Sequence, residues 1–394
     1  MNSVPFAVTS SAGLTAQSFH DSMSGDERNA SQRRRVLMTV DAVGGVWRYA
    51  MELAAALRPL GIEVIFVGLG PRPTAEQSVE AERMGRLMWL EEPLDWMTTD
   101  EAALDRLPTL LTRLVDKYQV ELLHLNLPSQ ASGLDVPVPV VVVSHSCVVT
   151  WWKAMKTSAL PPEWQWQRER NSAGFRRADA IVAPSASHAD LLDRCYGPLP
   201  GLSVVCNGIA AFLHGEAKEP FVFAAARWWD EGKNAAVLDA AAETASWPIY
   251  MAGPRRSPAG HEVCLDHVTA LDELPYEQVL NLTRRAGIFV SPSLYEPFGL
   301  AALEAARAGA ALVLADIPTY RELWSGAAEF FDPHDAGQLT RKINEMAADA
   351  ELRADLGSRA LARSRRFTPD VQARSMAELY GSLIETPTSF LVEA

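Results

Sequence analysis

Cysteine is scarce in this sequence: four occur among 394 residues, and no two of them form a Cys-x-x-Cys pair. Scattered cysteines indicate neither a zinc site nor a disulfide framework, and they favour a reducing, cytoplasmic location. Long apolar runs are also missing, since no stretch approaches the roughly 18 residues of a membrane-spanning helix. The nearest candidate, residues 136–143, has the length of a strand.

Clustered positive charge is equally rare. The net charge of −13 argues against a nucleic-acid partner, because neutralising phosphates requires grouped Lys and Arg side chains. The basic run Arg33-Arg34-Arg35 is interpreted as a solvated domain edge, with a weak contact to anionic lipid as the alternative. Residues 1–32 lack the apolar segment of a secretory signal, and we expect residues 1–33 to form a disordered tail.

Short apolar runs alternate with amphipathic segments along the rest of the chain. A first set of expected strands covers residues 36–40, 62–67, 122–125, 138–144, 180–183 and 203–206. A second set covers residues 221–226, 249–252, 287–290 and 311–314. Helices are expected at residues 46–57, 233–244, 336–346 and 371–384, the last capped by Thr368. Continuous apolar strands separated by helices predict parallel sheets covered on both faces.

The domain boundary is expected within residues 207–220, which contain glycine, histidine and charged residues without periodicity. A first doubly wound domain then covers residues 34–208, and a second covers residues 209–366. The apolar content of 48% is sufficient to fill two cores of this size.

The most informative segment is residues 290–316, in which Glu296 and Glu304 flank Pro297-Phe298-Gly299-Leu300 at the predicted start of a helix. Proline suits a first helical turn, and glycine lets a ligand approach the backbone closely. Free N–H groups and the positive end of the helix dipole favour a phosphate there. Glu304 can offer a carboxylate to sugar hydroxyls, so this segment indicates a nucleotide-sugar site.

This Glu-x7-Glu arrangement resembles the signature of the retaining family 4 glycosyltransferases of the GT-B fold. The resemblance implies an α/β protein with two Rossmann-like domains facing across a cleft, the first for the acceptor and the second for the nucleotide sugar. A C-terminal helix, residues 367–386, would cross back to complete the first domain. Glu296 would lie near the transferred sugar, the amides of residues 298–300 would hold sugar or phosphate, and Glu304 would bind the ribose. The alternative is that both glutamates are ordinary helix charges.

Two further segments resemble donor-binding elements of that family. Gly44 and Gly45 follow the first predicted strand, where they allow close approach to a helix N-terminus, and they resemble the loop that faces the donor diphosphate. Arg227 and Lys233 follow the first strand of the second domain and resemble the family's Arg-Leu-x5-Lys segment. Such cations would stabilise the charge of a departing nucleoside diphosphate. A tight turn and ordinary surface cations are the respective alternatives.

The sequence contains no Asp-x-Asp triplet, the motif that holds a divalent metal in many other glycosyltransferases. We therefore expect metal-independent transfer, with no metal site and no cofactor besides the nucleotide-sugar co-substrate. The base is expected near Gly253 and residues 271–274. Asp272 stands there where family members often carry glycine, and uridine, guanosine and adenosine donors all stay open.

His145 ends the predicted strand 138–144, at the edge where open α/β sheets place their ligands. It resembles the histidine that lies near the donor sugar in this family, and the alternative is a structural histidine bonded to a loop. His124 has a similar position at the end of residues 122–125.

Aromatic side chains supply the predicted acceptor site, because their faces suit the C–H faces of sugars or an apolar aglycone. We assign acceptor contact to Trp47, Trp151 and Trp152, with Lys153 as a polar contact. Core packing is the alternative for each tryptophan.

The sequence thus predicts a glycosyltransferase that moves a hexose from a nucleotide-diphosphate sugar to the hydroxyl group of a glycan, a lipid-linked molecule or a small molecule. Retention of configuration is implied by the resemblance, and the predicted catalytic residues are Glu296, His145, Arg227 and Lys233. The alternative is a catalytically silent regulatory partner that binds sugar nucleotides. A dehydrogenase is discounted, because Gly68-Leu69-Gly70 lacks a third glycine and is followed by proline.

Overall fold

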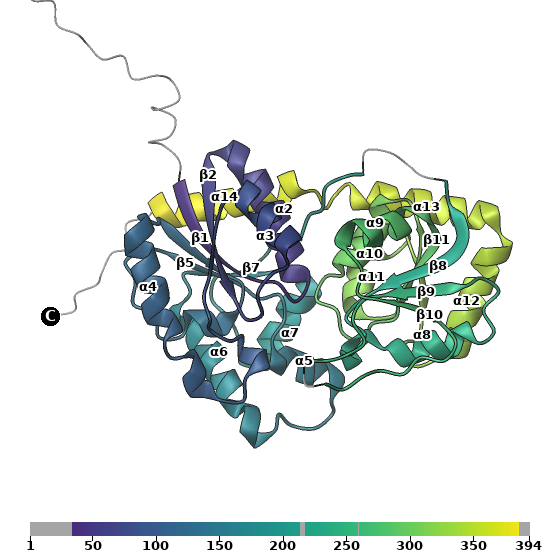
Figure 1. The fold of residues 1–394 in the computed structure, drawn as a ribbon, viewed down its shortest axis with the longest axis horizontal. Coiled ribbons are helices and arrows are strands. Elements are labelled where there is room, and N and C mark those ends of the chain that lie inside the picture. Colours follow the sequence, from purple (N-terminus) through teal and green to yellow (C-terminus); the bar gives the residue numbers. More distant parts are fainter. Residues whose placement is uncertain (1–33, 213–216, 259, 386–394) are drawn as a thin grey trace, which may run out of the picture. The chain divides into compact units, whose positions relative to one another are not determined.

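The apolar runs form two parallel sheets with helices packed on both faces of each (Figure 1). The structure is a computed structural model that describes residues 34–212, 217–258 and 260–385. The predicted disordered tail, residues 1–33, lies outside the described residues. The described residues belong to one compact unit.

The first sheet has the strand order β3-β2-β1-β4-β5-β6-β7. Its strands are β1 (Arg34–Asp41), β2 (Ile62–Leu69), β3 (Arg86–Trp89), β4 (Leu122–Leu125), β5 (Val140–Val143), β6 (Ala180–Ala183) and β7 (Leu202–Val204). Its helices are α2 (Gly45–Leu57), α3 (Ala75–Met84), α4 (Leu107–Tyr118), α5 (Val148–Met155), α6 (Gln165–Arg177) and α7 (Ala186–Tyr196). We call this sheet with its helices the N-terminal lobe.

The second sheet has the order β10-β9-β8-β11-β12-β13. Its strands are β8 (Glu219–Ala225), β9 (Ile249–Ala252), β10 (Thr269–Asp272), β11 (Ala286–Ser291), β12 (Ala311–Ala315) and β13 (Glu329–Phe331). Its helices are α8 (Ala235–Ala242), α9 (Tyr276–Arg285), α10 (Leu300–Arg307), α11 (Pro318–Trp324), α12 (Ala336–Ala348) and α13 (Ala350–Ser364). This sheet and its helices are the C-terminal lobe.

Both sheets reverse their strand order at one point, between β1 and β4 in the first and between β8 and β11 in the second. In open parallel sheets, ligands bind outside the carboxyl ends of the strands at this switch point, because the two flanking loops diverge there and leave a crevice. The loops that follow β1, β4, β8 and β11 are therefore the ones positioned to form a site.

Burial on both faces explains why the central strands consist of continuous apolar runs. In β1, Val36, Met38 and Val40 pack into the core cluster on one face of the sheet, whereas Leu37 belongs to the cluster on the opposite face. Successive side chains of a strand point to opposite faces, so each β-branched run fills two cores at once.

The last helix, α14 (Pro369–Glu385), lies against α2 of the N-terminal lobe, where it appears in yellow in Figure 1. Ala373, Met376 and Tyr380 are buried in the same core cluster as the α2 side chains. The predicted cap is confirmed, because Thr368 Oγ1 accepts a hydrogen bond from the backbone N–H of Val371 at 3.2 Å. Within the described ranges, no helix is long and apolar enough to cross a membrane.

Candidate functional site

A cavity of about 810 Å³ lies at the carboxyl ends of the strands, and residues of both lobes line it. The N-terminal lobe contributes the loop after β1 and the segment that follows β5, and the C-terminal lobe contributes the loops after β8 and β11. Ten of the residues predicted for the site line this cavity: Gly44, Gly45, His145, Trp151, Arg227, Lys233, Glu296, Phe298, Gly299 and Leu300. The switch points of the two sheets thus open onto a single space.

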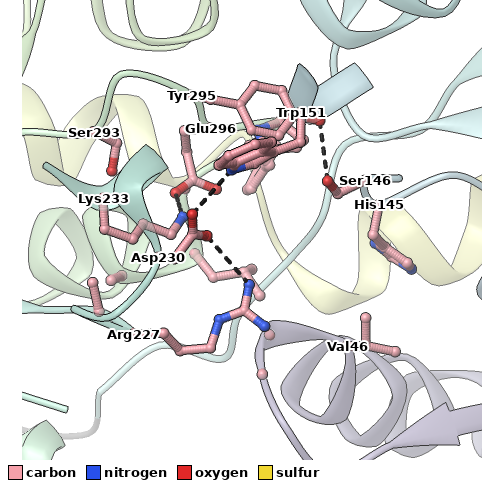
Figure 2. A pocket seen from close by; sticks show the side chains of 18 of the residues that line it. Val46, His145, Ser146, Trp151, Arg227, Asp230, Lys233, Ser293, Tyr295 and Glu296 are labelled. Atoms are coloured by element: carbon pink, nitrogen blue, oxygen red, sulfur yellow. Dashed lines mark hydrogen bonds and ion pairs between the residues drawn. The ribbon is translucent and has the colours of Figure 1, made fainter. Parts of the chain in front are cut away.

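The two lobes also contact each other beside the cavity. The Tyr295 hydroxyl lies 3.2 Å from Ser146 Oγ and 2.9 Å from Thr150 Oγ1, as Figure 2 shows for the Ser146 bond. Trp151 Nε1 donates to Asp230 Oδ1 at 3.0 Å. These hydrogen bonds join α5 and the segment just before it to the loops after β8 and β11, so the cavity wall is continuous from one lobe to the other.

The glycine loop after β1 faces the C-terminal lobe at close range. A Cβ atom at Gly44 would lie 3.1 Å from Arg227 Nη1, and one at Gly45 would lie 3.3 Å from Leu300 Cδ1. Gly44 is the N-cap of α2, and none of the described side chains caps this helix end. The Trp47 N–H donates to the Gly44 carbonyl at 3.2 Å, so the N–H groups of Gly45 and Val46 are the ones available to an anion.

The start of α10 repeats this arrangement in the C-terminal lobe. Gly299 is its N-cap with φ of 90°, and no side chain of the described residues caps the helix. A Cβ atom at Gly299 would lie 2.7 Å from Tyr320 Cε1, so both the backbone conformation and the available space require glycine. Two uncapped helix N-termini consequently border the same cavity.

Two cations complete this border. Lys233 Nζ lies 2.6 Å from Glu296 Oε2, and both side chains are largely buried, with 16% and 17% of their surface exposed. Arg227 lies 3.9 Å from Asp230 Oδ2, and its guanidinium lies over the Trp229 ring at 5.4 Å. Figure 2 shows the side chains of Lys233, Glu296, Asp230 and Arg227 grouped on one side of the cavity.

Backbone hydrogen bonds hold the loop after β8 and the loop after β11 together. The N–H groups of Leu294 and Tyr295 both donate to the carbonyl of Gly232, at 2.9 and 3.3 Å. The position of Lys233 relative to Glu296 is therefore fixed by the backbone as well as by their ion pair.

Glu304 lies elsewhere. It is buried, with 6% of its surface exposed, and does not line the cavity, so the alternative that it is a solvated helix residue is wrong. The Tyr276 hydroxyl donates to Glu304 Oε1 at 2.8 Å, and the Arg48 guanidinium of the N-terminal lobe lies 4.6 Å from the centre of the Tyr276 ring. Burial raises the pKa of Glu304 to about 7, against the hydrogen bond from Tyr276, which lowers it.

His145 lines the cavity at the end of β5. Its Nε2 lies 2.9 Å from Asn126 Oδ1, and its ring meets the Tyr49 ring edge-on at 4.3 Å between centroids. Burial, together with the neighbouring His124 and His188, lowers the pKa of His145 to about 3. The ring is therefore neutral at pH 7.

The structure places one of the four predicted acceptor residues in the cavity wall. Trp151 lines the cavity, whereas Trp152 and Lys153 do not. Trp47 is 5% exposed and belongs to the core, where its Nε1 donates to Glu80 Oε2 at 2.8 Å. The core-packing alternative thus describes Trp47, and we leave it out of the site.

Three other tryptophans line the cavity: Trp96, Trp164 and Trp229. The prediction did not assign them to the site, although Trp229 adjoins the Arg227 segment in sequence. Trp96 and Trp164 follow no strand or motif that marks them, so only the folded chain brings them to this wall.

Gly253 and Asp272 meet away from the cavity lining. The N–H of Gly253 donates to the Asp272 carbonyl at 2.7 Å, and a Cβ atom at Gly253 would lie 1.9 Å from the carbonyl oxygen of Ala226. Asp272 has a positive φ of 53°, a conformation that favours glycine and that aspartate tolerates better than most residues. Among the described residues, no group of three or more His, Cys, Asp or Glu side chains is arranged to hold a metal ion.

Known protein families match both lobes. Residues 43–211 match the model of Glycosyltransferase Family 4, and residues 255–363 match the model of Glycosyl transferases group 1. Among curated relatives, the serotype-specific mannosyltransferase WbdA of Escherichia coli is 34% identical over 92 residues, which are 23% of this chain and 11% of that protein. The glycogen synthase of Mycobacterium tuberculosis is 24% identical over 382 residues, covering 85% of this chain and 89% of that protein.

Solved structures share the whole described fold. A sucrose-phosphate synthase from Thermosynechococcus elongatus superposes with a TM-score of 0.73 at 18% identity, covering 89% of this chain and 99% of the other. Anabaena HepE, in complex with UDP and glucose, superposes with a TM-score of 0.69 at 16% identity, covering 89% and 100%.

Two Rossmann-like sheets with a cavity at their carboxyl edges define a protein of the GT-B fold. With both lobes matched by glycosyltransferase models, the chain belongs to the family 4 glycosyltransferases of this fold.

Proposed function

We propose that this protein transfers a hexose from a nucleotide-diphosphate sugar to a hydroxyl group of an acceptor, with retention of configuration at the anomeric carbon and without a metal ion. The observation that carries the proposal is the convergence of two uncapped helix N-termini and two cations on one cavity. A diphosphate is the ligand that such a group of donors and positive charges suits best.

The donor diphosphate would bind between Gly44 and Gly299, with Arg227 and Lys233 beside it. In the proposed reaction the acceptor oxygen bonds to the anomeric carbon while the bond from that carbon to the diphosphate breaks on the same face. The acceptor proton passes to the departing phosphate oxygen. Charge grows on the diphosphate during this step, so donors that are already in position lower the barrier without reorganisation of solvent.

Glu296 would orient the transferred sugar rather than attack it. Its carboxylate is held by Lys233 at 2.6 Å, and an ion-paired carboxylate is a weaker nucleophile than a free one. This pairing supports front-face attack by the acceptor. Trapping of a covalent glycosyl adduct on Glu296 would overturn this mechanism.

The similarity to known glycosyltransferases supports two parts of the proposal, retention of the anomeric configuration and the choice of donor. The retaining chemistry follows the family resemblance of the Glu296 segment, and the UDP and glucose bound to Anabaena HepE favour UDP-glucose as the first donor to test. Metal independence follows the lack of an Asp-x-Asp triplet in the sequence. The acceptor would approach from the tryptophan side of the cavity, near Trp151.

A ligand screen followed by an activity assay tests the proposal. We expect UDP, GDP or ADP to raise the melting temperature, because a ligand that binds only the folded state stabilises it. The nucleotide sugar with the matching base should be hydrolysed slowly without acceptor, at the same rate with and without EDTA. Binding without any hydrolysis or transfer would instead favour the silent regulatory partner, and failure of all three nucleotides to bind would remove both functions.

A further inference from the structure

Four tryptophan side chains line the cavity and come from separate parts of the chain. We call them the tryptophan wall: Trp96, Trp151, Trp164 and Trp229. Two of them lie in short 3₁₀ helices of the N-terminal lobe, Asp95–Met97 and Pro162–Trp164, one lies in α5, and one follows β8 in the C-terminal lobe. All four are partly exposed rather than buried in a core, so their ring faces can contact a ligand.

Neighbouring side chains hold the rings of the tryptophan wall in place. The Arg227 guanidinium lies 6.0 Å from the centre of the Trp96 ring and 5.4 Å from the centre of the Trp229 ring, so one cation contacts aromatic rings of both lobes. Trp164 meets the Trp152 ring edge-on, at 5.2 Å between centroids. The rings are therefore in position before a ligand binds, and stacking on them requires little further ordering.

The tryptophan wall also contains hydrogen-bond donors. Trp151 uses its Nε1 atom within the protein, because it donates to Asp230 Oδ1 at 3.0 Å (Figure 2). The Nε1 atoms of Trp96, Trp164 and Trp229 have no hydrogen-bond partner among the described residues. An indole N–H only donates, so these groups suit the hydroxyl and ether oxygens of a ligand whose apolar face lies on the rings.

The charges of the cavity lining disfavour an anionic acceptor. Among the described residues, the only Arg and Lys side chains in this lining are Arg227 and Lys233, and the proposed function assigns both to the donor diphosphate. Four carboxylates line the same cavity: Asp41, Asp230, Glu231 and Glu296. A phosphate or carboxylate group on the acceptor would therefore find no further cation of this kind and would meet charges of its own sign.

We propose that the acceptor is an uncharged hydroxyl compound with a flat apolar face, and that this face stacks on the tryptophan wall. A neutral sugar ring and an aryl ring both have such a face, and both can place oxygen atoms against the indole N–H groups. The inference names the acceptor class of the site and rests on the proposed glycosyl transfer. It excludes acceptors that are recognised through a phosphate or carboxylate group.

Matched neutral and phosphorylated compounds test the charge of the acceptor. The panel contains glucose, mannose, phenyl β-glucoside, 4-methylumbelliferone, glucose 6-phosphate and mannose 6-phosphate. Release of the nucleoside diphosphate is measured with whichever of UDP-, GDP- and ADP-glucose the protein hydrolyses, and calorimetry on the protein with that nucleotide bound gives the Kd of each compound. We expect neutral compounds to stimulate release, and each sugar phosphate to have a kcat/KM at least about 10-fold below that of its neutral counterpart.

Stimulation by sugars alone would identify a sugar ring as the stacked group, and stimulation by 4-methylumbelliferone alone would identify an aryl ring. A sugar phosphate that binds or reacts better than its neutral counterpart, or a panel in which no neutral compound binds or stimulates release, would overturn the inference. Donor hydrolysis without acceptor is recorded in the same reactions, and its absence would count against the proposed function instead.

Substitutions of Trp164 test the stacking. Trp164→Leu should raise the KM of the best neutral acceptor about 2- to 12-fold, the range that one aromatic contact supplies, and should raise the KM of the donor less. Trp164→Phe keeps a ring face and should show a smaller increase. Trp247→Leu is the matched control, because the Trp247 ring also packs against a guanidinium, that of Arg353 at 4.6 Å, but does not line the cavity. An unchanged acceptor KM in Trp164→Leu, or an equal increase in Trp247→Leu, would refute stacking on the tryptophan wall.

Discussion

Replacing Lys233 by alanine removes the cation closest to Glu296 and tests the proposed chemistry most directly. Under the proposed function, Lys233 stabilises the charge of the departing diphosphate. Loss of one positioned donor of this kind costs about 2.7–4 kcal/mol of transition-state stabilisation, or ~10²–10³ in kcat. We therefore expect kcat to fall by about two to three orders of magnitude, with a smaller change in KM.

The same substitution has a structural effect that must be separated from the catalytic one. Lys233 Nζ lies 2.6 Å from Glu296 Oε2 in a largely buried pair, so Lys233→Ala leaves a carboxylate without its partner. An unsatisfied group of this kind costs about 1–3 kcal/mol of stability. In the double variant Lys233→Ala/Glu296→Gln that charge is gone, so the melting temperature should recover.

Lys342 supplies the matched control. Its Nζ lies 2.9 Å from Glu329 Oε2 in a more exposed pair, with 29% and 32% of the side chains exposed, and it does not line the cavity. Exposed ion pairs contribute about 0–1 kcal/mol, so Lys342→Ala should change neither kcat nor stability appreciably. Steady-state kinetics and thermal unfolding of all three variants separate the catalytic effect of Lys233 from its effect on stability. A kcat of Lys233→Ala equal to that of the wild type, or an equal loss of kcat in Lys342→Ala, would refute the role of Lys233.

Three further predictions follow from glycine and glutamate positions. Gly299→Ala should weaken UDP binding at least about 10-fold, measured by calorimetry, because at φ of 90° its Cβ atom would lie 2.7 Å from the Tyr320 ring. Gly309→Ala is the control: Gly309 also has a positive φ, of 74°, but no atom of the described residues lies near its Cβ position. That variant has the backbone strain without the steric clash and should leave UDP binding unchanged. Glu304 lies outside the cavity lining, but the family resemblance implies that it binds the ribose, so Glu304→Ala should weaken nucleotide binding, whereas Glu296→Ala should mainly lower kcat. Small, equal effects of the two substitutions would remove both assignments. Burial raises the pKa of Glu304 from 4.5 to about 7, so the folded state takes up its proton first and gains stability as the pH falls from 7 to 4.5. Glu304→Gln lacks this gain. In urea titrations, its free energy of unfolding relative to that of the wild type should fall by about 2 kcal/mol between pH 7.5 and pH 5. The same pH dependence in both proteins would contradict the raised pKa.

The central strands could be predicted from sequence because they are buried on both faces. Residues 122–125 and 180–183 are continuous apolar runs, and both are strands with the predicted bounds. Three strands at sheet edges, β3, β10 and β13, were not predicted. They are short and partly exposed, and they include charged residues such as Arg86, Asp272 and Glu329, so no apolar run marks them.

The helix after β8 begins later than predicted. The sequence predicts helix from residue 233, but α8 begins at Ala235, because Asn234 adopts a left-handed conformation with φ of 57°. Asn234 Nδ2 donates to the carbonyls of Pro292 and Pro333, which fixes the residue in this turn. Such a side-chain bond to a distant loop leaves no local pattern in the sequence.

The position of Trp47 could have been predicted correctly from the same helical spacing that located α2. Trp47, Ala50, Met51 and Ala54 recur at intervals of three and four residues and are all buried. Tryptophan in such a stripe belongs to the core, whatever its distance in sequence from a glycine loop.

The cavity wall that contains the glycines and cations was easier to predict than the tryptophan wall for a physical reason. Each element of the first wall is a strand, loop and helix, and the parallel sheets bring their carboxyl ends to one edge, so Gly44, Arg227 and Gly299 converge once the strands are placed. The tryptophan wall has no such rule, because Trp96 and Trp164 come from two separate 3₁₀ helices whose meeting depends on packing between distant elements. The wall proposed to bind the donor therefore follows from a repeated local pattern, whereas the wall proposed to bind the acceptor depends on connecting segments that the fold positions but does not dictate.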